Sequence, residues 1–160
     1  MDQLVRPIGR IRTPFTRTPG MPIQPRYAGG ARGRIELEPS YRAGLADLDG
    51  FSRLWAIYLF HASSGFSLTV TPYLDREPRG VFATRAPRRP NPIGLSCYRI
   101  LTVDEAGIDV CDVDVLDETP LLDLKPYVPA FDAWPDARAG WADEAGASEH
   151  PGRADDRFSR

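Results

Sequence analysis

Residues 94–116 read GLSCYRILTVDEAGIDVCDVDVL, two apolar runs joined by a short polar turn. Both runs are rich in β-branched and aromatic residues, which favour strands. The segment TVDEAGIDV (102–110) is typical of a tight β-hairpin in which Gly107 supplies the turn. In the second run the alternation of apolar residues changes phase across Cys111–Asp112, as it does at a β-bulge. The stretch therefore predicts two neighbouring antiparallel strands.

Similar short segments recur along the chain, each bounded by Gly, Pro or Asp. They are VRPIGRIR, GRIELE, RLWAIYLFHA, LTVTPYL, GVFATR and PLLDLKPYV. One segment, near Tyr41–Leu48, is typical of a short helix. The glycine-rich GGARG (29–33) leads into a strand instead of opening a helix, which argues against a Rossmann nucleotide-binding fold. Many short strands with few helices predict a mainly β protein, a small closed or nearly closed antiparallel β-barrel without a βαβ unit.

The length and composition are those of a single-domain globular protein. The chain has 160 residues, of which 42% are hydrophobic and 26% charged. From about Trp134 large apolar residues become rare, so we expect a barrel domain over residues 1–141 and a flexible C-terminal tail over 142–160. No apolar run is long enough for a membrane span, and the first residues lack the apolar core of a secretory signal. These features, together with only two cysteines, predict a cytoplasmic protein.

Charge is distributed unevenly along the chain. Residues 1–100 carry 15 Arg against 7 Asp or Glu, a net charge of +8, whereas residues 101–160 have a net charge of −10. This asymmetry permits a basic face that binds a polyanion. The two parts could equally interleave in one sheet, so the asymmetry in sequence is suggestive of a nucleic-acid partner and no more.

The densest positive charge lies in RAPRRPNPIGLS (85–96), whose prolines exclude both helix and sheet. Such a stiff loop loses little entropy on binding a ligand, but a solvated arginine-rich turn is an equally good interpretation. No nucleophile and base stand together, since His61 follows an apolar strand and is typical of a core or rim histidine. The alternation around Asp112 and Asp114 predicts an exposed sheet face, and we expect no metal site there.

Five longer strings together resemble the TsaA-like, or TrmO, family of tRNA methyltransferases. They extend from about residue 5 to residue 141 and are RPIGRIRTPF, GMPIQP, GLADLDGFSRLWAIYLFH, GVFATRAPRRPNPIGLS and LDETPLLDLKPYVPAFDAWPDARAGW. The resemblance implies a small TsaA-like β-barrel, unlike the Rossmann and knotted methyltransferases, that binds S-adenosylmethionine as a homodimer. It further implies methylation of N6 of N6-threonylcarbamoyladenosine at position 37, next to the anticodon of threonine tRNA. Trp55, Tyr58 and Phe60 in one strand favour a dimer interface near the cofactor pocket, unless all three are core residues.

The resemblance also implies a cofactor site. Matched motif by motif, its residues are Pro22, Ile23, Gln24, His61, Ala62, Arg85, Leu95, Asp117, Glu118, Thr119 and Pro120. Ile23 stands where the family has Arg, and Glu118 stands where it has Gly. The second departure concerns the backbone, because a turn that needs a positive φ tolerates Glu poorly. We expect a short form without the additional C-terminal domain of longer members, which leaves tRNA recognition to the barrel.

Methyl transfer needs alignment of the reacting atoms and a polar group that receives the N6 proton. Asn91 and Asp117 are candidates for that group, and the sequence does not choose between them. Arg88, Arg89 and Lys125 are expected to contact tRNA phosphates. Two other functions stay open: a non-catalytic barrel that binds RNA or an adenosine-type ligand, and a methyltransferase that acts on another substrate.

Overall fold

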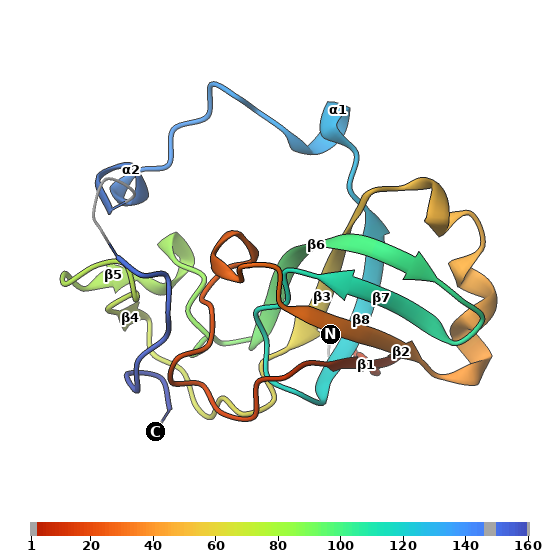
Figure 1. Cartoon of the computed structure of the whole chain (residues 1–160). Coiled ribbons are helices and arrows are strands. Elements are labelled where there is room, and N and C mark those ends of the chain that lie inside the picture. Colours follow the sequence, from red (N-terminus) through yellow and green to blue (C-terminus); the bar gives the residue numbers. More distant parts are fainter. Residues whose placement is uncertain (1–2, 146–149, 160) are drawn as a thin grey trace.

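The computed structural model describes residues 3–145 and 150–159, and its main body is a closed six-stranded barrel (Figure 1). In chain order the barrel strands are β1 (Gly9–Arg12), β2 (Arg32–Leu37), β3 (Arg53–Leu59), β6 (Ile93–Val103), β7 (Gly107–Cys111) and β8 (Thr119–Pro126). Around the barrel they follow the order β1–β2–β7–β6–β3–β8, and every neighbouring pair is antiparallel. The predicted mainly β, antiparallel barrel is confirmed.

The remaining elements are short. The strands β4 (Thr69–Val70) and β5 (Arg79–Gly80) form a separate two-stranded sheet. The helices are η1 (Pro25–Tyr27), η2 (Pro39–Leu45), η3 (Leu48–Gly50), η4 (Val81–Ala83), α1 (Pro129–Asp132) and α2 (Trp141–Ala145). None of the helices in the described part of the chain has the length and hydropathy of a membrane span.

The helix predicted near Tyr41–Leu48 consists of two 3₁₀ helices, η2 and η3, instead of one α-helix. Asp47 separates them because its backbone is left-handed, with φ 67°. A non-glycine residue in that conformation ends a right-handed helix, so the segment cannot continue as a single element.

The barrel core follows from strict alternation along its strands. In β3, Leu54, Ala56 and Tyr58 are buried and alternate with half-buried residues. On β6, opposite the inner face of β3, Gly94 is a glycine of necessity, since a Cβ there would overlap with the ring of Tyr58. Tyr98 also points inward and is fully buried. Polar hydroxyl groups are therefore enclosed together with the apolar core.

The predicted hairpin between β6 and β7 is confirmed. Asp104 Oδ1 accepts hydrogen bonds from the amides of Ala106 (2.8 Å) and Gly107 (3.0 Å), which fixes the turn. The predicted bulge is placed differently: β7 ends at Cys111, and Asp112 turns out of the sheet with φ 74°. The register shift lies on the facing strand, between residues 100 and 102.

This turn overturns the expected exposed face at Asp112 and Asp114. Because the chain leaves the strand at Asp112, alternation no longer applies to the residues that follow. Val113, Asp114 and Val115 are consecutively buried, with exposures of 0%, 7% and 4%. A carboxylate is thus enclosed where the sequence pattern predicts a solvated one.

The described part of the predicted tail packs against the body of the protein. The amide of Gly20 donates a hydrogen bond to the carbonyl of Ala154, and the amide of Ala154 donates one to the carbonyl of Met21, both at 2.8 Å. Phe158 stacks edge to face on Tyr73, with ring centroids 5.0 Å apart. Backbone hydrogen bonds and one aromatic anchor therefore hold residues 150–159 although their composition is polar. Residues 146–149 of the predicted tail lie outside the described residues.

Candidate functional site

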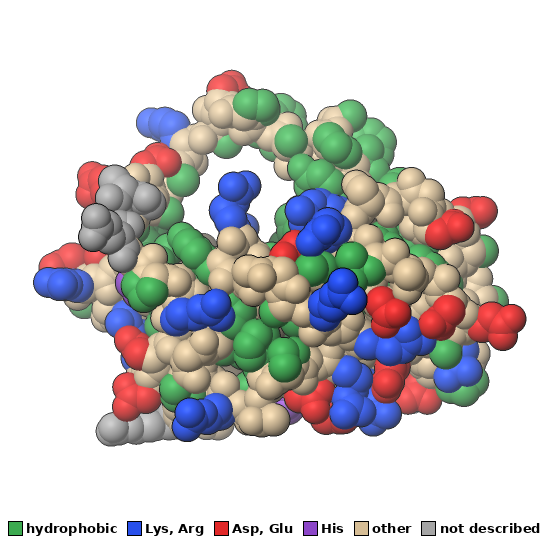
Figure 2. All heavy atoms as spheres, viewed as in Figure 1, with side chains coloured by type: hydrophobic (Ala, Val, Ile, Leu, Met, Phe, Trp, Pro, Cys, Tyr) green, Lys and Arg blue, Asp and Glu red, His purple; other side chains and the backbone are tan. Residues whose placement is uncertain are grey.

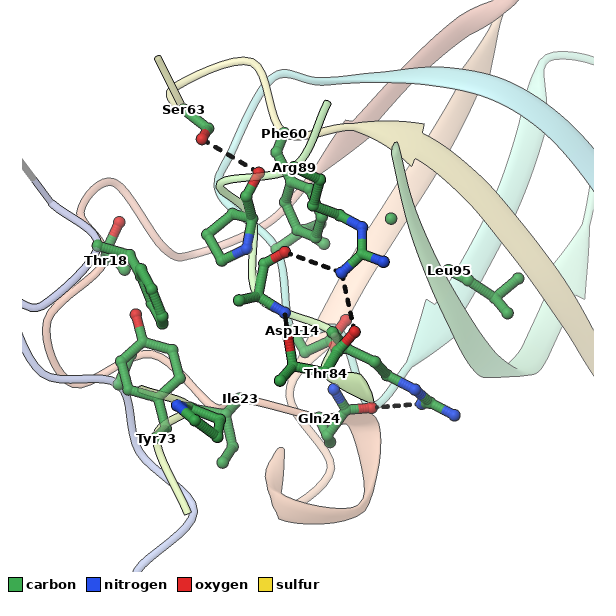
Figure 3. Close-up of a pocket in the computed structure, with 18 of the residues that line it drawn as sticks. Thr18, Ile23, Gln24, Phe60, Ser63, Tyr73, Thr84, Arg89, Leu95 and Asp114 are labelled. Carbon is green, nitrogen blue, oxygen red and sulfur yellow. Dashed lines mark hydrogen bonds between the residues drawn. The ribbon is translucent and has the colours of Figure 1, made fainter. Parts of the chain in front are cut away.

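A cavity of about 700 Å³ opens at one end of the barrel, where β3 ends and β6 and β8 begin (Figure 3). This volume lies within the range of small-molecule sites. Its walls come from segments far apart in the sequence, within residues 21–24, 58–63, 82–89, 93–95, 114–116 and 139–142, with Ala154 and Phe158 from the C-terminal segment. Barrel closure and the docked C-terminal segment therefore build the cavity together.

Most of the predicted cofactor residues line this cavity. Eight of the eleven do so, namely Pro22, Ile23, Gln24, His61, Ala62, Arg85, Leu95 and Thr119. Asp117, Glu118 and Pro120 are not among its lining residues. The fold thus brings together residues from four motifs that are far apart in the sequence.

Arg85 is held at the mouth of the cavity. Its Nη1 donates a 2.8 Å hydrogen bond to Oε1 of Gln24, another lining residue. The backbone before and after it is fixed by Thr84, whose hydroxyl donates to the carbonyl of Val81 (2.9 Å) and accepts from the amide of Ala86 (3.3 Å). The guanidinium is exposed and keeps donors that can bind a carboxylate.

Arg89, which is predicted to contact phosphate, has a structural role in the loop. Its Nη1 donates to the carbonyls of Val81, Thr84 and Ala86 at 3.2, 2.8 and 3.3 Å. One guanidinium nitrogen therefore closes the proline-rich loop on itself, as the dashed lines in Figure 3 show in part. Arg88 is half-buried and lies outside the cavity lining, so its contact with phosphate stays a prediction.

Two other predicted residues lie away from the cavity. Lys125 is exposed and pairs with Asp123 at 2.8 Å, six residues along β8 from Thr119 and thus roughly 20 Å from the cavity end. Asn91 is exposed and does not line the cavity. The contact of Lys125 with tRNA phosphate stays a prediction, and its place outside the lining disfavours Asn91 as the proton acceptor.

Asp117 and Glu118 belong to an ion-pair cluster on the barrel rim. Asp117 accepts hydrogen bonds from Nε of Arg12 and the amide of Thr13, both at 3.0 Å. Burial would raise the pKa of Asp117, but these hydrogen bonds outweigh burial and lower it. Arg12 and Thr13 thus hold the carboxylate of Asp117 outside the cavity lining, which disfavours the predicted catalytic role.

The turn at Glu118 has the geometry that favours glycine. Its φ is 63°, and its carboxylate pairs with Arg10 (3.1 Å) and Arg12 (3.0 Å). The departure from the family's glycine is thus accommodated in a left-handed conformation, beside the cavity and not within its lining.

Sequence reasoning missed the carboxylate that does line the cavity. Asp114 is 7% exposed, and its Oδ1 accepts hydrogen bonds from Ser96 Oγ (2.8 Å) and Tyr98 OH (2.9 Å). Tyr58 OH lies 2.9 Å from Ser96 Oγ and extends the network. Burial raises the pKa of Asp114 to about 6, although both hydrogen bonds and the charge of Arg85 oppose the change. The one available signal was the row of hydroxyl residues at inward positions of β3 and β6.

Aromatic residues of the cavity wall were also missed. Tyr73, Phe82 and Trp141 line it, and Trp141 Nε1 donates to the carbonyl of Ala83 at 2.8 Å. Trp141 lies at the start of α2, and the chain between α1 and α2 arches from the far end of β8 to this wall (Figure 1). Figure 2 shows an opening beneath the arch, with Lys or Arg side chains at its edge. Aromatic faces and a basic edge suit a ligand with planar rings and negative charge.

Comparison with known proteins agrees with this geometry. The family model described as tRNA-methyltransferase O N-terminal domain matches residues 10–133. A probable S-adenosyl-L-methionine-binding protein of Pyrococcus abyssi is 44% identical over 153 residues, 96% of this chain and 83% of that protein. The tRNA (adenine(37)-N6)-methyltransferase of Escherichia coli is 38% identical over 152 residues, 89% of this chain and 65% of that protein.

A solved structure shares the fold. The crystal structure of TrmO from Pseudomonas aeruginosa superposes with a TM-score of 0.77 at 42% identity, covering 89% of this chain and 64% of that one. The chain thus spans just under two thirds of the E. coli and Pseudomonas proteins.

Proposed function

Because the chain belongs to the tRNA-methyltransferase O N-terminal domain family, we propose that it is an S-adenosylmethionine-dependent methyltransferase acting on N6 of adenosine 37 in tRNA. The substrate that the sequence resemblance favours is N6-threonylcarbamoyladenosine next to the anticodon of threonine tRNA. The observation that carries the proposal is the convergence of eight motif residues on one cavity of ligand size.

The chemistry of the cavity fits the cofactor. The Arg85 guanidinium suits the carboxylate of the cofactor, and the aromatic walls suit its adenine ring. When bound, S-adenosylmethionine supplies an electrophilic methyl group on a sulfonium sulfur. Ile23 offers an apolar contact where the family has a cation. Arg85 therefore has a larger share in binding the carboxylate of the cofactor.

The protein contributes alignment more than chemistry in this scheme. The loop that carries Arg85 is stiffened by prolines and clamped by Arg89, so the side chain is presented at a fixed point. Because the loop is already ordered, the protein loses little conformational entropy when a ligand binds there. The scheme needs no nucleophile from the protein, because the target nitrogen attacks the methyl group directly.

We also propose that two copies associate near the cavity and work in the cytoplasm, where tRNA is modified. The sequence argument for a dimer fails in part, since Tyr58 is 3% exposed and packs on Phe60, with ring centroids 5.5 Å apart. Other aromatic side chains support association: Phe82, Phe131 and Trp134 are 76%, 76% and 74% exposed. Light scattering at micromolar concentration should give twice the mass of one chain, and the mass of a single chain with the cofactor bound contradicts a dimer.

Two measurements test the activity. Calorimetry measures binding of S-adenosylmethionine to the full chain, and mass spectrometry of tRNA nucleosides follows methylation by the purified protein. We expect both to be positive, with Arg85→Lys weakening cofactor binding and Arg32→Lys, on the exposed face of β2, leaving it unchanged. Cofactor binding without tRNA methylation favours another substrate, and RNA binding without cofactor binding favours a non-catalytic barrel.

A further inference from the structure

We propose that Oδ2 of Asp114 receives the proton that leaves the target nitrogen during methyl transfer. This inference rests on the proposed function and assigns a catalytic residue to it. The side chain lies among the residues that line the cavity, near the centre of the close-up in Figure 3.

Two hydrogen bonds hold the carboxylate of Asp114 and leave its second oxygen without a side-chain donor. Both hydrogen bonds to Asp114 from Ser96 and Tyr98 end on the same oxygen, Oδ1. Within residues 3–145 and 150–159, the side-chain hydrogen bonds to this carboxylate leave Oδ2 without a side-chain donor, and the residue borders the cavity. Two donors on one oxygen hold the plane of the carboxylate, so Oδ2 keeps its direction when a ligand enters.

The other candidates for this role are badly placed. Asn91 lies outside the cavity lining, and an amide oxygen is a much weaker base than a carboxylate. Asp117 is occupied by Arg12 and Thr13 on the barrel rim. His61 lines the cavity but is exposed at its edge. Asp114 is the buried carboxylate among the described lining residues.

The proton balance of the reaction needs such a group. As the N–CH₃ bond forms and the S–CH₃ bond breaks, the electron pair of the broken bond stays on sulfur. The target nitrogen would then carry a positive charge unless it lost its hydrogen. Transfer of that hydrogen to Oδ2 leaves a neutral methylated nitrogen and a neutral carboxylic acid, which returns the proton to water.

The surroundings of Asp114 suit an acceptor that works near neutral pH. The titratable or charged groups facing it are Tyr98 from β6, Tyr58 from β3 and Arg85 from the loop after η4. Burial raises the pKa of Asp114 to about 6. At pH 7 to 8 the carboxylate is thus mostly ionised, yet more basic than an exposed one, which is the compromise that acid–base catalysis favours.

The test compares four forms of the full chain in single-turnover methyl transfer to tRNA between pH 5 and 8.5. They are the wild type, Asp114→Asn, Tyr98→Phe and Asp109→Asn. The last is the matched control, because Asp109 is a partly exposed carboxylate on β7 that pairs with Arg34 of β2. We expect the wild-type rate to rise with pH around 6. We expect Asp114→Asn to slow transfer by at least 100-fold and to abolish that rise, and Asp109→Asn to follow the wild type.

Two further readouts separate catalysis from structure. Calorimetry of Asp114→Asn should give S-adenosylmethionine affinity within about threefold of the wild type. Carbon-13 NMR of the carboxyl groups, without ligand, should show a group titrating near 6 that is absent from Asp114→Asn. In Tyr98→Phe that midpoint should move upward, because the lost hydrogen bond stabilised the ionised form, and the midpoint of the rate profile should move with it.

The outcomes are distinguishable. A wild-type chain that neither binds the cofactor nor methylates tRNA overturns the proposed function, and the role of Asp114 with it. An active wild type with a rate profile that persists in Asp114→Asn overturns the role of Asp114 alone and points to another group such as His61. Cofactor binding lost in folded Asp114→Asn also overturns it, since the carboxylate would then be a cofactor ligand.

Discussion

Replacing Asp114 by asparagine should stabilise the folded protein at neutral pH. Burial raises the pKa of this carboxyl group in the folded state to about 6, against an ordinary value of 3.8. Below 3.8 the group is protonated in both states and has no pH-dependent effect. Between 3.8 and about 6 the folded state holds the proton more tightly, so stability falls as pH rises, and above about 6 the loss is complete.

The size of this effect follows from the two pKa values. At about 1.4 kcal/mol per pKa unit, the difference corresponds to roughly 3 kcal/mol, of which about 2 to 3 kcal/mol accrues between pH 4 and pH 8. Asparagine keeps an oxygen that accepts from Ser96 and Tyr98 and carries no charge to bury. The advantage of Asp114→Asn over the wild type should therefore grow by this amount over that range.

Urea unfolding at fixed temperature measures the difference in stability between Asp114→Asn and the wild type. With a urea dependence of roughly 2 kcal/mol per molar for a domain of this size, the variant's midpoint should gain about 1 M relative to the wild type between pH 4 and pH 8. Comparing the two forms cancels the titration of other groups. A constant difference between the two midpoints at both pH values would refute the reasoning, because it would mean that the carboxylate is not buried in its charged form.

Three other substitutions test separate features. Arg85→Lys should weaken S-adenosylmethionine binding about tenfold, or about 1.4 kcal/mol, in calorimetry, because lysine lacks the planar fork; unchanged affinity would remove Arg85 from the site. Glu118→Gly should raise the free energy of unfolding by about 1 kcal/mol, since φ 63° strains any residue but glycine; a loss of stability would mean that the ion pairs dominate. Gly152→Ala should speed amide exchange in residues 150–159 at least tenfold while the barrel stays protected, because its Cβ would overlap with the ring of Tyr27 and its φ is 66°; unchanged exchange would show that this segment is held elsewhere.

The sequence predicts the barrel well because alternation in its strands is a local property. The burial pattern of β3 and the turn at Asp104 can both be read from neighbouring residues. The predictions from sequence are wrong where the backbone conformation of a single residue determines where an element ends. Asp47 and Asp112 adopt left-handed conformations that split a helix and end a strand, and nothing in residue type alone requires them to do so.

The candidate site is predictable only in part for a related reason. Motif resemblance places residues such as Arg85 and Gln24 together, and the structure shows them hydrogen-bonded. Resemblance cannot say which members of a motif face inward. Thr119 lines the cavity while Asp117, two residues earlier, points to Arg12 on the rim. Asp114 was assigned to the wrong side because alternation was extended beyond the end of β7.

Closure of the barrel has a consequence for how the protein is made. Ile11 of β1 pairs with Thr119 of β8, 108 residues later. One edge of β3 also pairs with β8 and stays unpaired until β8 is synthesised. At typical rates of synthesis, roughly 5 to 20 s separate the emergence of these strands, during which β1 and β3 expose unpaired edges. Among the barrel strands, β6 and β7 are the pair joined by a short hairpin, so they can pair early. Folding in the cell should therefore be slow and dependent on chaperones, and variants that destabilise the barrel should appear first as reduced yield of soluble protein.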